Sequence, residues 1–231
     1  MVASGGHDGG RWIDVAPERL AGWLDSFALR HGQAAAQPSP AVITFRGSDG
    51  AIAECHVPFP PLPAPLPAPL PDGAASWPER MTAHALADRT VGVLLVRLGG
   101  YAAGVFTGPG AQLIASKVGS RLVHGRSAAG GTSQHRFARR REKQAAEALG
   151  AAADTAATVL APYAGKLDAV VLGGDRRAIA GLRDDPRLRP YFDLAVDRFL
   201  TVPDPRLAVL RGTPKLFRAV RIRLTEPPGG S

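Results

Sequence analysis

A proline-rich run at residues 58–71 limits how this chain can fold more than any other feature. Eight of its fourteen residues are proline. Proline lacks an amide donor and fixes φ, so the run excludes a helix and a central strand. We expect a stiff polyproline II linker over residues 58–75 that divides the chain into two parts. Docking of this run on an SH3-like partner is an alternative that the sequence leaves open.

Composition excludes several classes of protein. The chain has 231 residues, 45% hydrophobic and 21% charged, enough for one large core or two small ones. No stretch is apolar for long enough to predict a membrane-spanning helix, and the N-terminus lacks the pattern of a secretory signal. The single cysteine, Cys55, excludes an internal disulfide and a cysteine-based zinc site. We therefore expect a cytoplasmic monomer without membrane contact, metal or cofactor.

The first part of the chain, residues 1–57, should comprise a Gly-rich tail, a helix and a β-hairpin. Apolar residues at spacings of three and four predict an amphipathic helix over 16–31. Two apolar runs, at 41–46 and 51–57, flank an Asp-Gly turn and predict the hairpin. The last residues of the chain, 227–231, are expected to form a second tail.

The second part, residues 76–226, shows an ordered succession of elements. Apolar runs separated by glycine turns predict three strands, at 91–97, 101–107 and 112–117. Strands joined by such tight turns form an antiparallel meander. A long alanine-rich helix, predicted over 134–161, follows a glycine-rich loop, and its alanines favour both helix and close packing on a sheet.

The remaining pattern completes the fold class. Beyond the long helix we expect a buried strand at 167–172, a helix at 175–183 and a strand at 199–202. Residues 208–210 are ambiguous, and 216–224 suit a last helix or strand. The order β-β-β-α-β-α-β predicts an α/β domain with a mixed sheet in RNase H-like order, extended by the N-terminal helix and hairpin.

The loop before the long helix ends in Gly130, Gly131, Thr132, Ser133 and Gln134. Glycines let a backbone approach a ligand closely, and a helix N-terminus carries a partial positive charge. These features suit a loop tip that enters a tight, phosphate-lined site. A simpler interpretation stays open, in which the loop is a flexible connection whose Ser or Thr caps the helix.

Positive charge is concentrated around this loop. The formal net charge is +8, and residues 117–143 hold eight basic residues against one acid, Glu142. A solvated helix face normally mixes both signs, so this concentration indicates a surface that meets phosphates. The basic residues are Lys117, Arg121, Arg126, Arg136, Arg139, Arg140, Arg141 and Lys143.

The segment from Lys117 to Arg141, with VHGRSAAGGTSQHRFARRR at residues 123–141, resembles the signature of the VLRF family. These are Vms-like release factors, the peptidyl-tRNA hydrolases of ribosome quality control. In size and layout the chain is similar to bacterial, actinobacterial-type members, and by element order the resemblance covers about 90–224. It implies the fold of the central catalytic domain of eukaryotic and archaeal class-one release factors.

The resemblance also implies an activity. It implies cleavage of the ester joining a nascent peptide to tRNA, on stalled or split ribosomal complexes, with Gln134 as the catalytic residue. Its implied partners are peptidyl-tRNA and the large ribosomal subunit with its RNA, whose phosphates the basic residues would hold. The loop departs from the Gly-Gly-Gln motif of ordinary release factors, because Thr132 and Ser133 separate Gly131 from Gln134. No decoding domain is evident, which argues against stop-codon reading.

Two other functions remain alternatives. A nuclease of the RNase H type needs carboxylates on its first strands to hold Mg²⁺, and residues 91–117 contain no Asp or Glu. Cleavage of the tRNA acceptor end without a metal stays open. A non-catalytic module that binds the ribosome or tRNA would keep the basic residues and would not need Gln134.

Overall fold

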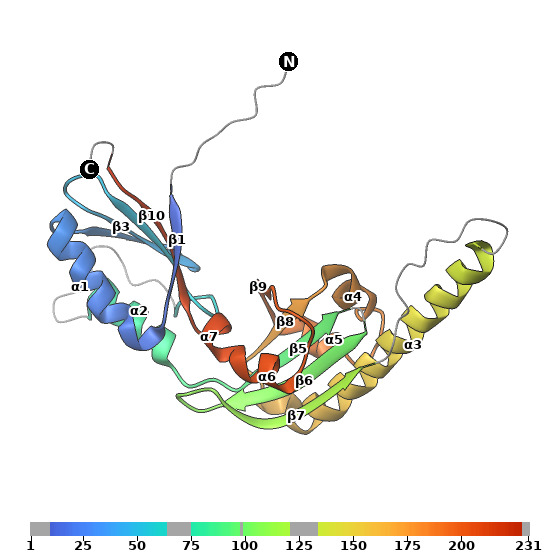
Figure 1. Cartoon of the computed structure of the whole chain (residues 1–231). Coiled ribbons are helices and arrows are strands. Elements are labelled where there is room, and N and C mark those ends of the chain that lie inside the picture. Colours follow the sequence, from blue (N-terminus) through green and yellow to red (C-terminus); the bar gives the residue numbers. More distant parts are fainter. Residues whose placement is uncertain (1–9, 64–74, 98, 121–133, 228–231) are drawn as a thin grey trace, which may run out of the picture. The chain divides into compact units, whose positions relative to one another are not determined.

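The chain forms two compact units (Figure 1). Unit 1 takes its residues from both ends of the chain, up to Ala87 and from Arg218 on, and unit 2 spans Asp88–Phe217. None of the described helices is long and apolar enough to cross a membrane. The computed structural model describes residues 10–63, 75–97, 99–120 and 134–227, with the backbone alone for 134–141.

The border between the units differs from the division drawn from the sequence. Two elements belong to unit 1 although the sequence-based division placed their residues in the second part. They are α2 (Trp77–Leu86) and β10 (Val220–Thr225). The start of the proline-rich run also packs in unit 1, because the Leu62 amide donates to the Pro40 carbonyl at 2.7 Å. Residues 64–74 of the predicted linker lie outside the described residues, as do 1–9 and 228–231 of the predicted tails.

Unit 1 contains a five-stranded antiparallel sheet in the order β1-β10-β4-β3-β2. The predicted hairpin is confirmed as β3 and β4, with Gly50 at a φ of +94° in its turn. Two strands were not predicted, β1 and β2, and β10 lies inside the sheet with its alternate residues buried. The four strands besides β10 are β1 (Arg11–Val15), β2 (Ala35–Pro38), β3 (Val42–Arg46) and β4 (Ile52–His56).

The helices of unit 1 are α1 (Leu20–His31), preceded by the short 3-10 helix η1 (Pro17–Arg19), and α2. The predicted helix over 16–31 is thus confirmed. Both α1 and α2 contribute to a core with one face of the sheet, built around Phe27, Met81 and Ile222.

Unit 2 contains a mixed sheet in the order β7-β6-β5-β8-β9. The first three strands form the predicted antiparallel meander, β8 is parallel to β5, and β9 is parallel to β8. Parallel strands need a crossover, and the long helix supplies it between β7 and β8. The strands are β5 (Val91–Arg97), β6 (Gly100–Thr107), β7 (Gln112–Ser120), β8 (Ala169–Gly174) and β9 (Ala195–Leu200).

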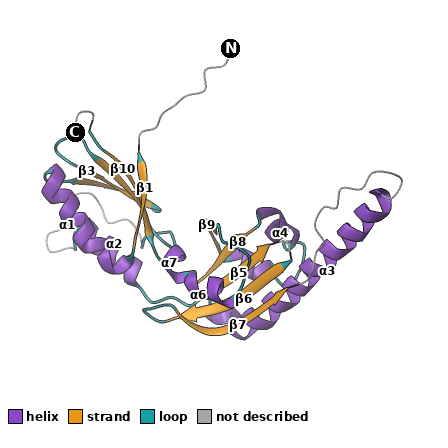
Figure 2. Cartoon of the chain, in the orientation of Figure 1, coloured by secondary structure: helices purple, strands orange, loops and turns teal. Residues whose placement is uncertain are grey.

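Helices cover both faces of this sheet (Figure 2). On one face lie α3 (Gln134–Leu160), α4 (Arg176–Gly181) and α5 (Arg189–Asp193), with the 3-10 helix η2 (Ala161–Lys166) after α3. On the other face Leu210 of α6 (Leu207–Gly212) lies against Gly104, and Phe217 of α7 (Pro214–Phe217) meets Phe106 edge-on at 5.6 Å.

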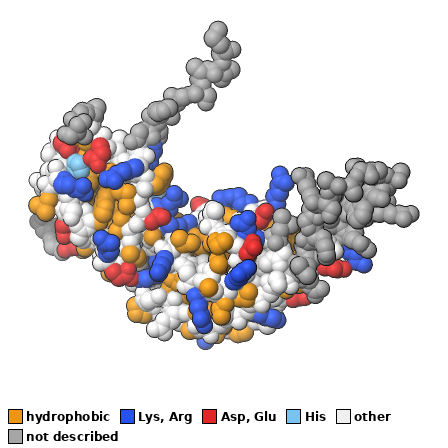
Figure 3. Space-filling model, in the orientation of Figure 1, with side chains coloured by type: hydrophobic (Ala, Val, Ile, Leu, Met, Phe, Trp, Pro, Cys, Tyr) orange, Lys and Arg blue, Asp and Glu red, His pale blue; other side chains and the backbone are white. Residues whose placement is uncertain are grey.

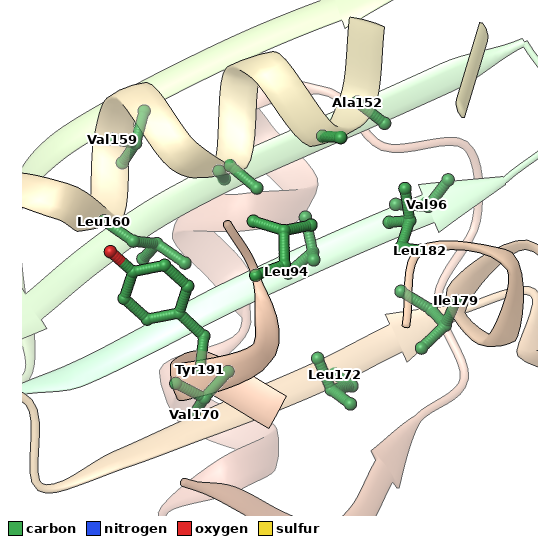
Figure 4. Close-up of a cluster of buried hydrophobic side chains, with 14 of the residues drawn as sticks. Leu94, Val96, Ala152, Val159, Leu160, Val170, Leu172, Ile179, Leu182 and Tyr191 are labelled. Atoms are coloured by element: carbon green, nitrogen blue, oxygen red, sulfur yellow. The ribbon is translucent and has the colours of Figure 1, made fainter. Parts of the chain in front are cut away.

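The core under α3 explains the alanine-rich sequence of that helix. Ala152 and Ala156 are fully buried, and Gly92 of β5 lets Leu160 approach so closely that a Cβ on Gly92 would lie 3.1 Å from it. Figure 4 shows Ala152, Val159 and Leu160 of α3 packed over the strand that carries Leu94, and side chains from β8, α4 and α5 complete the cluster. Small residues therefore let the helix lie close to the sheet.

The element order of unit 2 confirms the predicted β-β-β-α-β-α-β. The strand predicted at 199–202 is β9 and begins earlier, at Ala195. The ambiguous residues 208–210 lie in α6. The region 216–224 contains the end of α7 and then β10, which pairs in the sheet of unit 1.

Candidate functional site

The candidate site lies at the edge of the unit 2 sheet where β7 ends. Ser120 pairs with Gly100, Gly100 pairs with Arg97, and Val96 pairs with Gly174. The ends of β7, β5 and β8 and the start of β6 therefore share one edge. In α/β sheets, ligands bind beyond the carboxyl ends of the parallel strands, and this edge carries those ends of β5 and β8.

The predicted catalytic loop connects this edge to α3. Gly130, Gly131, Thr132 and Ser133 lie outside the described residues, together with the predicted RNA contacts Arg121 and Arg126. Gln134 is the first residue of α3, so the helix begins at the residue that the sequence singled out.

The helix α3 reaches well beyond its packed part. Its 27 residues correspond to a length of about 40 Å. The described contacts with the core begin at Leu149 and continue to Leu160. The N-terminal portion of α3 projects past the sheet of its own unit (Figure 1). That portion is the basic one, and its first turn contains no acid.

The predicted RNA-binding residues that the structure describes lie on two elements, β7 and α3. Lys117 is exposed on β7, and its partner in the register is Ala103, which is buried under α3. Paired residues of neighbouring strands share a face, so Lys117 is on the side of the sheet that α3 covers. The remaining described positions, Arg136, Arg139, Arg140, Arg141 and the exposed Lys143, are in the first three turns of α3.

An ion-pair network ties α3 to the segment between α4 and α5. Arg187 donates to Asp154 of α3 at 2.8 Å and to Asp185 at 2.7 Å. The Arg187 hydrogen bonds lower the pKa of Asp185, and hydrogen bonds from Asp185 and Asp154 raise the pKa of Arg187. These groups are at the surface, so the network contributes little to stability. It links α3 to the segment that precedes α5.

The end of β8 leads into α4 through two glycines and an aspartate. Gly173 is buried against Leu200, Gly174 has a φ of +101°, and the Asp175 carboxylate accepts the amides of Arg177 and Ala178. Asp175 therefore caps α4. The arginines that follow it at the same sheet edge were not identified as candidates from the sequence, although the Arg-Arg pair after a buried strand was a visible signal.

No metal centre is found among the described residues. Within them, no three His, Cys, Asp or Glu side chains gather closely enough to hold an ion. Cys55 is fully buried in unit 1, as expected of a small apolar strand residue, and burial raises the pKa of its thiol.

Comparison with known proteins identifies the family. Residues 89–223, more than half of the chain, match the model of the Actinobacteria/chloroflexi VLRF1 release factor. The chain therefore belongs to this release-factor family, and the resemblance noted in the sequence is confirmed. No curated protein matches the chain.

Several solved structures are similar to the chain in part. The crystal structure of an archaeal translation termination factor, aRF1, has 15% identity and a TM-score of 0.41, over 86% of this chain and 61% of that one. A structure described as an archaeal protein has 16% identity and a TM-score of 0.33, over 75% and 52%. The Vms1 mitochondrial localization core has 12% identity and a TM-score of 0.33, over 81% and 77%. The chain thus spans less than two thirds of the first two proteins.

Proposed function

We propose that this protein hydrolyses the ester between a nascent peptide and tRNA on stalled or split ribosomal complexes, as part of ribosome quality control. The observation that carries the proposal is the match of residues 89–223 to a release-factor family, which includes Gln134 and the loop before it. Gln134 is the first residue of α3, and the first turns of this helix are basic. This position supports the proposed role.

The reaction depends more on the correct placement of a water molecule than on a strong nucleophile. The ester is activated relative to an amide, so water can attack its acyl carbon. The bond from that carbon to the ribose oxygen then breaks, and the water proton passes to the ribose oxygen, assisted by the neighbouring ribose hydroxyl. Holding the water in attack geometry supplies much of the rate.

Glutamine suits this task because its amide orients water by hydrogen bonds and does not titrate. In the proposal, Gly130 and Gly131 allow the loop backbone to approach the terminal ribose, and Thr132 and Ser133 connect it to the helix. Gln134 then places the water. The loop holds no carboxylate or imidazole between residues 125 and 134, so the proposal assigns no general base to it.

The basic residues bind RNA in this account. Arginine forms bidentate contacts with phosphate, and a protein surface of this kind binds RNA with a steep salt dependence. The acceptor end of tRNA and the RNA of the large subunit are the proposed ligands, bound by a cytoplasmic monomer. The residues are Lys117, Arg121, Arg126, Arg136, Arg139, Arg140, Arg141 and Lys143.

The test is to incubate the purified protein with ribosomal complexes that carry a labelled peptidyl-tRNA. The proposal predicts a free peptide and a full-length tRNA, and no release by the Gln134→Ala variant. A tRNA shortened at its acceptor end would instead identify a nuclease. Intact peptidyl-tRNA that binds the protein without cleavage would identify a non-catalytic module.

A further inference from the structure

Three arginines outside the predicted site lie on and after α4, at the same sheet edge. Arg176 and Arg177 open α4 directly after β8, and Arg183 follows its end. All three are exposed. Among the described residues none of them forms an ion pair, although Asp175 and Asp184 are their direct neighbours in the chain. The Asp175 carboxylate accepts the amides of Arg177 and Ala178, and Asp185 is paired with Arg187.

Two of these arginines are held by aromatic rings. The guanidinium of Arg176 lies 4.3 Å from the ring centroid of Phe199 on β9, and that of Arg183 lies 4.8 Å from the ring of Phe192 on α5. Both rings pack against the core of unit 2. A stacked guanidinium is held in place while its N–H edge is free to bind phosphate. The two side chains are thus partly preorganised for such binding.

The arginines lie at the sheet edge where β7 ends, the point in the sequence after which the predicted catalytic loop begins. From the end of β7 to the end of β8 there are three strand spacings, about 14 Å. The end of α4 packs on α3, because a Cβ on Gly181 would lie 3.0 Å from Leu149. Leu149 is six residues, or about 9 Å, beyond Lys143, the last basic residue of the α3 cluster. Figure 3 shows Lys and Arg side chains over this part of unit 2, with Asp and Glu side chains among them.

We propose that Arg176, Arg177 and Arg183 form a second phosphate-binding surface, which holds the backbone of the RNA that enters the site. The assignment of RNA as the ligand rests on the proposed function. An arginine fork binds phosphate and carboxylate alike in bidentate fashion, so the experiment separates RNA from an acidic protein by competition.

The experiment measures the binding of fluorescein-labelled, deacylated tRNA to the full chain by anisotropy, over a range of salt concentrations. The variant is Arg176→Gln with Arg177→Gln and Arg183→Gln. Its control removes two charges from α6 and α7 on the other face of the same sheet, by Arg211→Gln and Lys215→Gln. Far-UV circular dichroism checks the fold, and Arg177→Gln alone, which disturbs no stacked ring, is the second variant.

The proposal predicts that the triple variant binds about tenfold more weakly than the wild type at moderate salt. Its slope of log affinity against log salt should be shallower by about 2 to 3, one for each lost phosphate contact. Arg177→Gln alone should remove about 1 from the slope, and the control should change the affinity less than about twofold.

Equal effects in the α4 variant and its control would overturn the proposal, as would no effect in either. Competition by polyglutamate as strong as by RNA would also overturn it, in favour of an acidic protein partner. Hydrolysis by the Gln134→Ala variant is a separate readout. If that variant keeps full activity, the proposed catalytic role fails, and the tRNA affinities still decide the role of α4.

Discussion

The guanidinium of Arg176 lies over the ring of Phe199, 4.3 Å from its centroid. Arg176→Lys keeps the positive charge and loses the planar group that stacks and binds phosphate in bidentate fashion. We expect this variant to bind tRNA about threefold more weakly, with a nearly unchanged salt slope. Arg211→Lys on α6 is the control. Wild-type affinity in Arg176→Lys would mean that charge alone matters at this position.

Gly150 is an exposed residue inside α3, and a Cβ added to it would meet nothing within 4 Å besides its chain neighbours and the nearby backbone of its own helix. Alanine there lowers the entropy of the unfolded chain and suits the helix, so Gly150→Ala should stabilise unit 2 by about 0.5–1 kcal/mol. Urea unfolding followed by circular dichroism and tyrosine fluorescence measures this, because the three tyrosines are all in unit 2. A loss of stability would contradict a continuous α3 at this residue.

Gly173, in contrast to Gly150, has no space for a side chain. A Cβ there would lie 2.8 Å from the Leu200 carbonyl oxygen and 2.9 Å from a methyl group of Leu95. The carbonyl belongs to the neighbouring strand and cannot move alone, so Gly173→Ala should destabilise unit 2 by about 1–3 kcal/mol. The same unfolding measurement tests it. A stability equal to that of the wild type would mean that β8 and β9 are not packed as described.

The start of α2 is closed by a capping box. The Glu79 amide donates to the Ser76 hydroxyl at 3.4 Å, and the Glu79 carboxylate accepts the Ser76 amide at 2.7 Å. Ser76→Ala should destabilise unit 1 by about 1 kcal/mol, measured by tryptophan fluorescence, because all three tryptophans are in unit 1. Ser26→Ala, which removes an exposed hydroxyl inside α1, should have less than half that effect.

The effect of Ser76→Ala should depend on pH. Hydrogen bonds from the Ser76 side chain and amide lower the pKa of Glu79. A lowered pKa in the folded state means that the stabilisation is present above the ordinary glutamate pKa of 4.5 and is lost as the pH falls through the lowered value. The difference in stability between the wild type and Ser76→Ala should therefore shrink in acid. A difference that stays constant down to acid denaturation would contradict the capping box.

Cys55 is fully buried on β4, and burial raises the pKa of its thiol. The thiolate attacks reagents such as Ellman's disulfide, so the native protein should react at least about 100-fold more slowly than the protein in denaturant. The rate should follow the opening of unit 1. Fast modification at native pH, without loss of tryptophan signal, would place Cys55 at the surface.

The elements of unit 2 could be predicted because each has a strong local pattern. The meander has glycine turns between apolar runs, and the buried face of α3 recurs at helical spacing from Ala145 onward. In unit 1, β1 and β2 were missed because they are short, and β1 is stabilised by pairing with a strand about 200 residues away. Local sequence does not encode such a partner.

Two other misses have different causes. The pattern Ser-Trp-Pro-Glu at 76–79 is a visible capping box, so α2 could have been predicted. The alternation of apolar residues in β10 could also be recognised in the sequence. The sheet to which β10 belongs could not, because that depends on the packing of Val220 and Ile222 with α1 and α2. At the site, the roles of Gln134 and of the basic residues around it were inferred from local residues and stay predictions, whereas the arginines of α4 reach the same edge only through the fold.

The most direct test of the central claim is hydrolysis of a defined peptidyl-tRNA in water enriched in ¹⁸O. Attack of water on the acyl carbon predicts one ¹⁸O atom in the carboxylate of the released peptide and a tRNA with a free terminal hydroxyl. Gln134→Ala should slow release at least about 100-fold, and Gln144→Ala, ten residues further along α3, should not. Release of a peptide that is still attached to adenosine without ¹⁸O, or full activity in Gln134→Ala, would contradict the account.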